Sequence, residues 1–147
     1  MAELHPFFVH FPIAIILVAA LFDVYGAFKK QIQHTTAAFT LLILAAISAL
    51  FAAISGNQAE SVIASQQVLS SSIGDTFATH TSIGNLAVWM IILVAVGRTF
   101  AVLEKKSWST KGWIFPAISV GLSLLLLATG LLGGQLSREI LQYFVNN

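Results

Sequence analysis

The chain has 147 residues, of which 57% are hydrophobic and only 9% are charged. A soluble domain carries roughly a quarter charged residues, so this chain has too few charges to cover a conventional water-facing surface. Seven Lys and Arg residues with a net charge of +1 also exclude a basic nucleic-acid-binding surface. The composition therefore predicts an integral membrane protein in contact with a lipid bilayer, and the absence of cysteine excludes disulfides and thiolate ligands.

Four apolar stretches are long enough to cross a bilayer, which takes about 20 residues per helix. In chain order they cover residues 6–28, 36–55, 76–100 and 113–133. Because these runs are continuous and do not alternate with polar residues, they exclude spanning β-strands. The predicted fold class is therefore all-α, an integral membrane antiparallel four-helix bundle. We expect a single transmembrane domain over residues 1–147, and no internal sequence repeat is evident.

Two further segments carry apolar residues among polar ones at helical spacing. The first is the 57–75 connection, in which Asn57 and Glu60 resemble a capping box, and the second is the C-terminal tail. Such patterns are typical of short amphipathic helices at the membrane interface. We therefore expect short interfacial helices in both segments, lying on the surface or packed against the bundle.

The basic residues indicate the orientation of the bundle. Lys29 and Lys30 follow the first span, and four more basic residues lie between Arg98 and Lys111. The positive-inside rule places both groups in the cytoplasm. Both termini would then face the periplasm of a bacterial inner membrane.

Three histidines lie toward the predicted outer ends of the spans. Pro6 suits the first turn of a helix and Asp75 suits an N-cap, so His10 and His80 would lie about four residues inside two parallel helices. Two imidazoles at one depth can share a ligand, and a histidine within a span is a functional candidate by default. We predict His10 and His80 as the ligand pair, with His5 as an alternative ligand or as a contact to a haem propionate.

Two neutral imidazoles suit a haem iron or another transition metal. Gly84 lies one turn after His80, and Ala14 stands in the same relation to His10, so both small residues would leave room for a porphyrin. Haem b is therefore the expected cofactor. The alternatives are a different transition metal bound by the same histidines, or a structural histidine pair. His34, beside basic and polar residues, is expected to be a solvated interface residue.

Two charges lie toward the other end of the spans. Arg98 follows His80 by eighteen residues, which is five full helical turns, so both side chains project from one face. Asp23 lies at a similar depth in the first span and is the expected partner of Arg98. We expect a structural ion pair, with a propionate anchor or a proton relay as the alternative roles.

The opening segment His5–Ala14 reads HPFFVHFPIA and resembles the HPxxVHFPIAL signature of a bacterial family of predicted four-helix membrane proteins of unknown function. Asp23, the Ser55–Gly56 pair, and His80 followed by Gly84 also fit the family pattern, so the resemblance covers essentially the whole chain. Some relatives resemble fusions to Rieske-type iron–sulfur domains. The resemblance therefore implies a redox setting, with the electron partner supplied by a separate molecule.

These features favour a small cytochrome b-like membrane protein that passes electrons near the periplasmic face, to or from a quinone or a periplasmic redox protein. This role is electron transfer or binding rather than stand-alone enzyme catalysis. Two alternatives remain: a copper or other metal-handling protein that uses the same histidines, and an accessory scaffold subunit of a larger membrane complex. Small residues in the fourth span also make a homodimer plausible.

Overall fold

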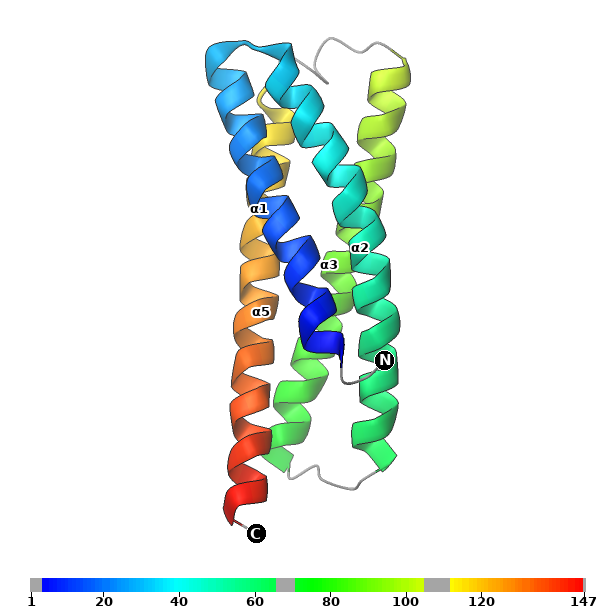
Figure 1. The fold of residues 1–147 in the computed structure, drawn as a ribbon, viewed down its shortest axis with the longest axis vertical. Coiled ribbons are helices and arrows are strands. Elements are labelled where there is room, and N and C mark those ends of the chain that lie inside the picture. Colours follow the sequence, from blue (N-terminus) through cyan, green and yellow to red (C-terminus); the bar gives the residue numbers. More distant parts are fainter. Residues whose placement is uncertain (1–3, 66–70, 105–111, 147) are drawn as a thin grey trace.

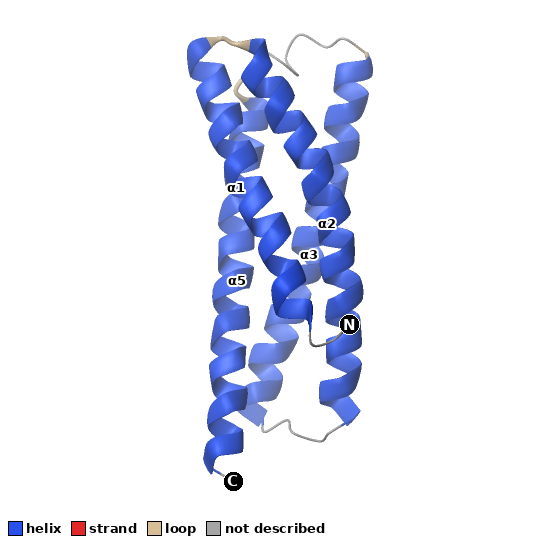
Figure 2. Cartoon of the chain, in the orientation of Figure 1, coloured by secondary structure: helices blue, strands red, loops and turns tan. Residues whose placement is uncertain are grey.

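The structure is a computed structural model that describes residues 4–65, 71–104 and 112–146. Within these ranges the chain forms four α-helices and no strand (Figures 1 and 2). The helices are α1 His5–Lys29, α2 Ile32–Ser65, α3 Ser71–Leu103 and α5 Ile114–Asn146. Each helix contains a stretch that is long and apolar enough to cross a membrane. The predicted all-α, four-helix membrane bundle is confirmed.

Consecutive helices run antiparallel and form a closed ring of neighbours (Figure 1). The packed pairs are α1–α2, α2–α3, α3–α5 and α5–α1. Helices α1 and α3 therefore run parallel on one diagonal of the bundle, and α2 and α5 occupy the other diagonal. The core combines a few branched side chains with many alanines, as in Ile16, Leu42, Ala45 and Ile91. Small residues of this kind let membrane helices approach closely.

The turn between α1 and α2 is closed by the backbone. Lys30 adopts the left-handed conformation, with φ 54° and ψ 35°. The N–H groups of Lys30 and Gln31 donate to the carbonyls of Ala27 and Gly26, which are otherwise unpaired at the helix end. Gly26 also allows α2 to approach, because a Cβ there would lie only 2.9 Å from Cγ2 of Thr35. We call this end of the bundle, with Lys29 and Lys30, the basic end.

The opposite end, which contains His5, is called the histidine end. Here the stretches that the sequence suggested as short interfacial helices are continuations of the bundle helices: α2 extends to Ser65, α3 begins at Ser71, and α5 extends to Asn146. Residues 66–70 of that connection lie outside the described residues. The buried side chains of Ile73 and Leu136 show the reason, because they pack inside the bundle and do not face a membrane surface. Figure 1 shows these three helices extending past the start of α1.

Candidate functional site

His5 is the first residue of α1, and its half-buried ring faces α2. The His5 Nδ1 atom lies 3.0 Å from the hydroxyl of buried Ser55, and that hydroxyl donates to the carbonyl of Ala52 at 2.9 Å. A serine hydroxyl has a single hydrogen, so Ser55 must accept from His5, and the proton of the neutral imidazole resides on Nδ1. The Nε2 atom of His5 therefore keeps a free lone pair that can bind a ligand.

The His5 ring lies directly on a glycine of the neighbouring helix. A Cβ added to Gly56 would lie 3.0 Å from Cε1 of His5 and 3.5 Å from its Nδ1. The first of these distances is at the limit for real Cβ contacts, so any side chain at position 56 would press on the ring. A side chain at position 56 would therefore displace the imidazole by a few tenths of an ångström from its observed place between α1 and α2.

His80 on α3 is held in the same way against α5. Its ring is half-buried, and a Cβ added to Gly133 would lie 3.0 Å from its Cε1 and 3.5 Å from its Nδ1. The Nδ1 atom is buried and makes no hydrogen bond, although the backbone of Thr129 lies nearby. His5 and His80 belong to the parallel helices α1 and α3 and lie at the same end of the bundle, where positive charges on the two imidazoles would repel each other. The structure thus brings His5 and His80 together at the histidine end.

The structure does not bring His10 to His80. The His10 side chain is exposed on the outside of the bundle, and its Nδ1 atom donates to the carbonyl of Pro6. Five residues along a helix rotate a side chain by about 140°, so His5 and His10 cannot both face the interior. His5, the alternative ligand, occupies the inner position, and the predicted pairing of His10 with His80 has to be corrected.

The two small residues expected beside the ligand also lie elsewhere. Ala14 is exposed on the outer surface with His10. Gly84 faces α5, where an added Cβ would make an ordinary 3.7 Å contact with Thr129. The glycines that touch the imidazoles are Gly56 and Gly133 instead. A signal for them exists in the sequence, because His5 and Gly56 are almost equally distant from the turn at Lys30, which places them opposite each other in a helical hairpin.

The basic end contains the expected ion pair of Asp23 and Arg98. The two guanidinium nitrogens lie 2.6 and 2.7 Å from the carboxylate oxygens, and both side chains are at most 1% exposed. Arg98 also donates to the carbonyl of Thr35, and the Ser119 hydroxyl donates to Asp23. The Arg98 guanidinium lies 4.7 Å from the ring centroid of Phe115. All four helices therefore contribute to this cluster.

The Asp23–Arg98 cluster is separate from the histidine site. Arg98 lies eighteen residues after His80 along α3, a rise of about 27 Å. The bundle interior between them contains Ile16, Leu42, Ile91 and small apolar residues. Arg98 therefore cannot contact a ligand held by His80, which removes the role of propionate anchor, and the geometry is that of a structural ion pair.

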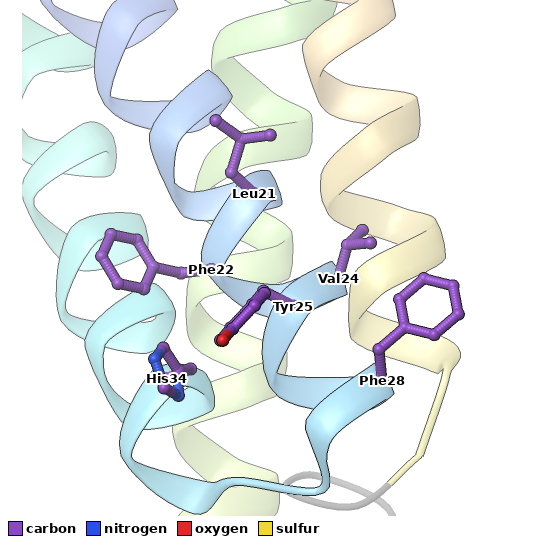
Figure 3. Close-up of a pocket in the computed structure, with 6 residues that line it drawn as sticks. All are labelled: Leu21, Phe22, Val24, Tyr25, Phe28 and His34. Atoms are coloured by element: carbon purple, nitrogen blue, oxygen red, sulfur yellow. The ribbon is translucent and has the colours of Figure 1, made fainter.

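His34, at the start of α2, does not lie free in solvent. Figure 3 shows it beside Phe22 and Tyr25 of α1, and its ring lies 5.9 Å from Phe22 and 4.8 Å from Tyr25, measured between centroids. These residues line a groove of about 600 Å³ together with Leu21, Val24 and Phe28. The groove is almost entirely apolar, and it lies at the basic end, remote from His5 and His80. The expectation of a solvated His34 is therefore wrong.

Comparison with known proteins identifies a family. Residues 2–141 of the chain match the family described as predicted membrane protein (DUF2231). No curated protein and no solved structure matches the chain. The match covers nearly all of both hairpins and includes His5, Ser55, His80 and Gly133.

Proposed function

The chain belongs to the DUF2231 family of predicted membrane proteins, and for this member we propose a haem b-binding function in membrane electron transfer. The axial ligands of the iron would be His5 and His80, each through Nε2. The observation that supports this most directly is the hydrogen bond from His5 Nδ1 to Ser55. Histidines that bind metals usually donate their other ring N–H to a polar neighbour, which fixes the tautomer and orients the ring.

The number of donors favours haem over a metal ion without a porphyrin. Haem leaves only its two axial positions to the protein, and imidazole is a common axial ligand. His5 and His80, on the two helices of one diagonal of the bundle, supply two such imidazoles. A copper or other metal ion bound by protein alone takes more ligands, and in the described part of the chain no group of three His, Cys, Asp or Glu residues could hold a metal ion. Haem is therefore the better candidate.

The contacts of both rings support the proposed cofactor. Each imidazole packs against a glycine of the neighbouring helix, at position 56 or 133, and these contacts orient the ring. Haem would supply reversible one-electron exchange at its iron. The protein would contribute the placement of the two imidazoles, through Ser55 for His5 and through the glycine contacts for both.

The proposal also assigns the histidine site to one side of the membrane. Lys29 and Lys30 at the basic end would face the cytoplasm by the positive-inside rule, so the histidine end would face the periplasm of a bacterium. The electron partner would then be a periplasmic redox protein or a membrane quinone that reaches this end of the bundle.

A reduced-minus-oxidised visible spectrum of the purified full-length protein, combined with elemental analysis, tests the cofactor. We expect haem bands. A bound metal without haem bands would support the metal-handling alternative, and the absence of both would support the scaffold alternative; either result contradicts the proposal.

Single substitutions then test the ligands. His5→Ala and His80→Ala should each remove or shift the haem bands. His10→Ala is the matched control, because it removes an exposed imidazole from the same helix. Bands that persist unchanged in His5→Ala but disappear in His10→Ala would restore the original pairing and refute the assignment made from the structure.

A further inference from the structure

Most of the buried positions of the first hairpin recur in the second hairpin. Five buried residues of α1 have buried counterparts 75 residues later in α3: Pro12 and Ala87, Ile16 and Ile91, Ala20 and Ala95, Asp23 and Arg98, Gly26 and Ala101. Four buried residues of α2 have buried counterparts 77 residues later in α5: Ala38 and Phe115, Leu42 and Ser119, Ala45 and Leu122, Ala49 and Leu126. Few of these pairs share the same residue type, which is why the repeat is not evident in the sequence.

The histidine site follows the same two offsets. His5 and His80 are 75 residues apart, and the glycines beneath their rings, Gly56 and Gly133, are 77 apart. A Cβ added to either glycine would lie at the same distances from its imidazole, 3.0 Å from Cε1, 3.5 Å from Nδ1 and 3.7 Å from Nε2. The backbone nearest the rings also corresponds, since Ala52 lies beside His5 and Thr129, 77 residues later, beside His80.

We infer that the hairpins α1–α2 and α3–α5 are related by a pseudo-two-fold axis along the bundle, and that the site consists of two equivalent half-sites, each with an imidazole, a glycine and a backbone carbonyl. The ligand therefore lies across this axis and offers two equivalent coordination positions, one to each hairpin. Parallel repeats related by an axis along the membrane normal occur in other membrane proteins, with binding sites at the repeat interface.

This arrangement narrows the class of ligand. The half-sites correspond in the imidazole, the glycine and the neighbouring backbone, and they differ in one hydrogen bond, which Ser55 accepts from His5 and for which Leu132 offers no acceptor beside His80. A metal centre that takes one imidazole from each hairpin, here His5 and His80, would fit this arrangement. The inference rests on the proposed function only for the identity of that centre as haem. The equivalence of the half-sites stands on the positions of the residues.

Paired glycine substitutions test the equivalence. In the full-length protein, Gly56→Ala and Gly133→Ala each put a methyl group against one imidazole. We expect both to lower the apparent Tm and the haem content per chain by comparable amounts. Gly134→Ala is the matched control, since an added Cβ there meets nothing within 4 Å. Its Tm should be unchanged or higher, because alanine is a better helix former than glycine.

The outcomes separate this inference from the proposed function. If only one of Gly56→Ala and Gly133→Ala behaves differently from Gly134→Ala, the half-sites are not equivalent and the inference is overturned. If the wild-type protein contains no haem, the proposed function fails. Matched losses in Tm for the two glycine variants would still support the paired half-sites in that case. The Tm reports how well each imidazole packs against its neighbouring helix, whether or not haem is bound.

Discussion

At the scale of single residues, Asp23 and Arg98 are the two buried charged residues in the described part of the chain, and they compensate each other. An isolated ion in a low-dielectric interior costs several kcal/mol, so a buried charge requires a partner and further hydrogen bonds. Here Asp23 receives two hydrogen bonds from Arg98 and one from Ser119, and Arg98 donates one more to the Thr35 carbonyl. The pair therefore fixes the register of all four helices at the basic end.

Removal of one partner should destabilise the bundle strongly. Arg98→Met leaves the Asp23 carboxylate buried and unpaired, with an expected loss of about 3–5 kcal/mol. The double variant Asp23→Leu/Arg98→Met should recover much of that loss, since neither charge remains. Thermal unfolding followed by size-exclusion chromatography measures both. Arg138→Met, which removes an exposed arginine from α5, is the control, and equal stability of Arg98→Met and Arg138→Met would contradict the account.

The two imidazoles differ in one hydrogen bond, and in the proposed haem site this difference should shift the midpoint potential of the iron. Ser55 accepts from His5, whereas the equivalent position beside His80 is Leu132, and His80 Nδ1 has no partner. An acceptor at Nδ1 makes an imidazole a stronger donor to ferric iron. Ser55→Ala should therefore raise the midpoint potential and Leu132→Ser should lower it, each by about 20–60 mV for a hydrogen bond of about 0.5–1.5 kcal/mol.

Redox titration of the purified variants measures these shifts. Ser61→Ala is the control, because Ser61 is exposed on α2. Shifts of the same sign in Ser55→Ala and Leu132→Ser would refute the role assigned to this hydrogen bond.

The sequence allowed the ion pair to be predicted, and it also contained a signal for the histidine of α1 that faces the interior. Arg98 follows His80 by eighteen residues, which is five full helical turns, so both side chains project from one face. Asp23 follows His5 by the same eighteen residues, whereas His10 lies on a face about 140° away from that of Asp23. Periodicity relative to Asp23 therefore favours His5, and the prediction of His10 came from its depth in the span. Hydrophobicity could not decide between the two, because apolar side chains surround α1.

At the scale of elements, the helix ends follow local backbone rules. Helix α1 stops where Lys30 adopts a left-handed conformation, which costs a non-glycine residue roughly 1–2 kcal/mol. The hydrogen bonds from Lys30 and Gln31 to the last turn and the packing of Gly26 on Thr35 offset this cost. The tight turn is therefore held by its surroundings rather than by the preference of its central residue.

Glycine at this turn should stabilise the protein. Lys30→Gly relieves the left-handed conformation and should raise stability by about 1 kcal/mol. Lys29→Gly changes the last helical residue instead and should lower stability by up to about 1 kcal/mol, since glycine is a poor helix former. A comparison of apparent Tm values measures the two effects, which both remove one lysine. A lower Tm for Lys30→Gly than for Lys29→Gly would show that the turn is not constrained in this way.

The sequence predicted the membrane-spanning part of each helix but not the continuation of the bundle helices at the histidine end. Three predicted spans lie inside observed helices and the fourth, 113–133, begins one residue before α5, because about 20 continuous apolar residues identify a spanning segment. The helical extensions at the histidine end mix apolar and polar residues, a pattern shared by surface helices and by bundle helices beyond the bilayer. The burial of Ile73 and Leu136 shows that these extensions are bundle helices and not surface helices. That burial depends on contacts between helices that are far apart in the sequence.

At the scale of the whole molecule, the two ends of the bundle are chemically different. The basic end has Lys29 and Lys30 above the Asp23–Arg98 cluster, and the histidine end has the two imidazoles beneath the extensions of α2, α3 and α5. In the orientation that we propose from the positive-inside rule, the basic end faces the cytoplasm. The histidine site would then be accessible to partners on the periplasmic side.

Cysteine labelling tests this orientation, because the natural chain contains no cysteine. In intact cells, a membrane-impermeant maleimide should label Asp75→Cys, at an exposed position of the histidine end. It should label Lys30→Cys only after the membrane is permeabilised. The reverse result would place the histidine site on the cytoplasmic side.

The central claim is that His5 and His80 together hold one haem, and low-temperature electron paramagnetic resonance of the oxidised full-length protein tests it most directly. We predict one haem per chain with a low-spin ferric signal, as two imidazole ligands produce, and loss of that signal in both His5→Ala and His80→Ala. A protein isolated without haem, or a low-spin signal that persists in both variants, would contradict the claim.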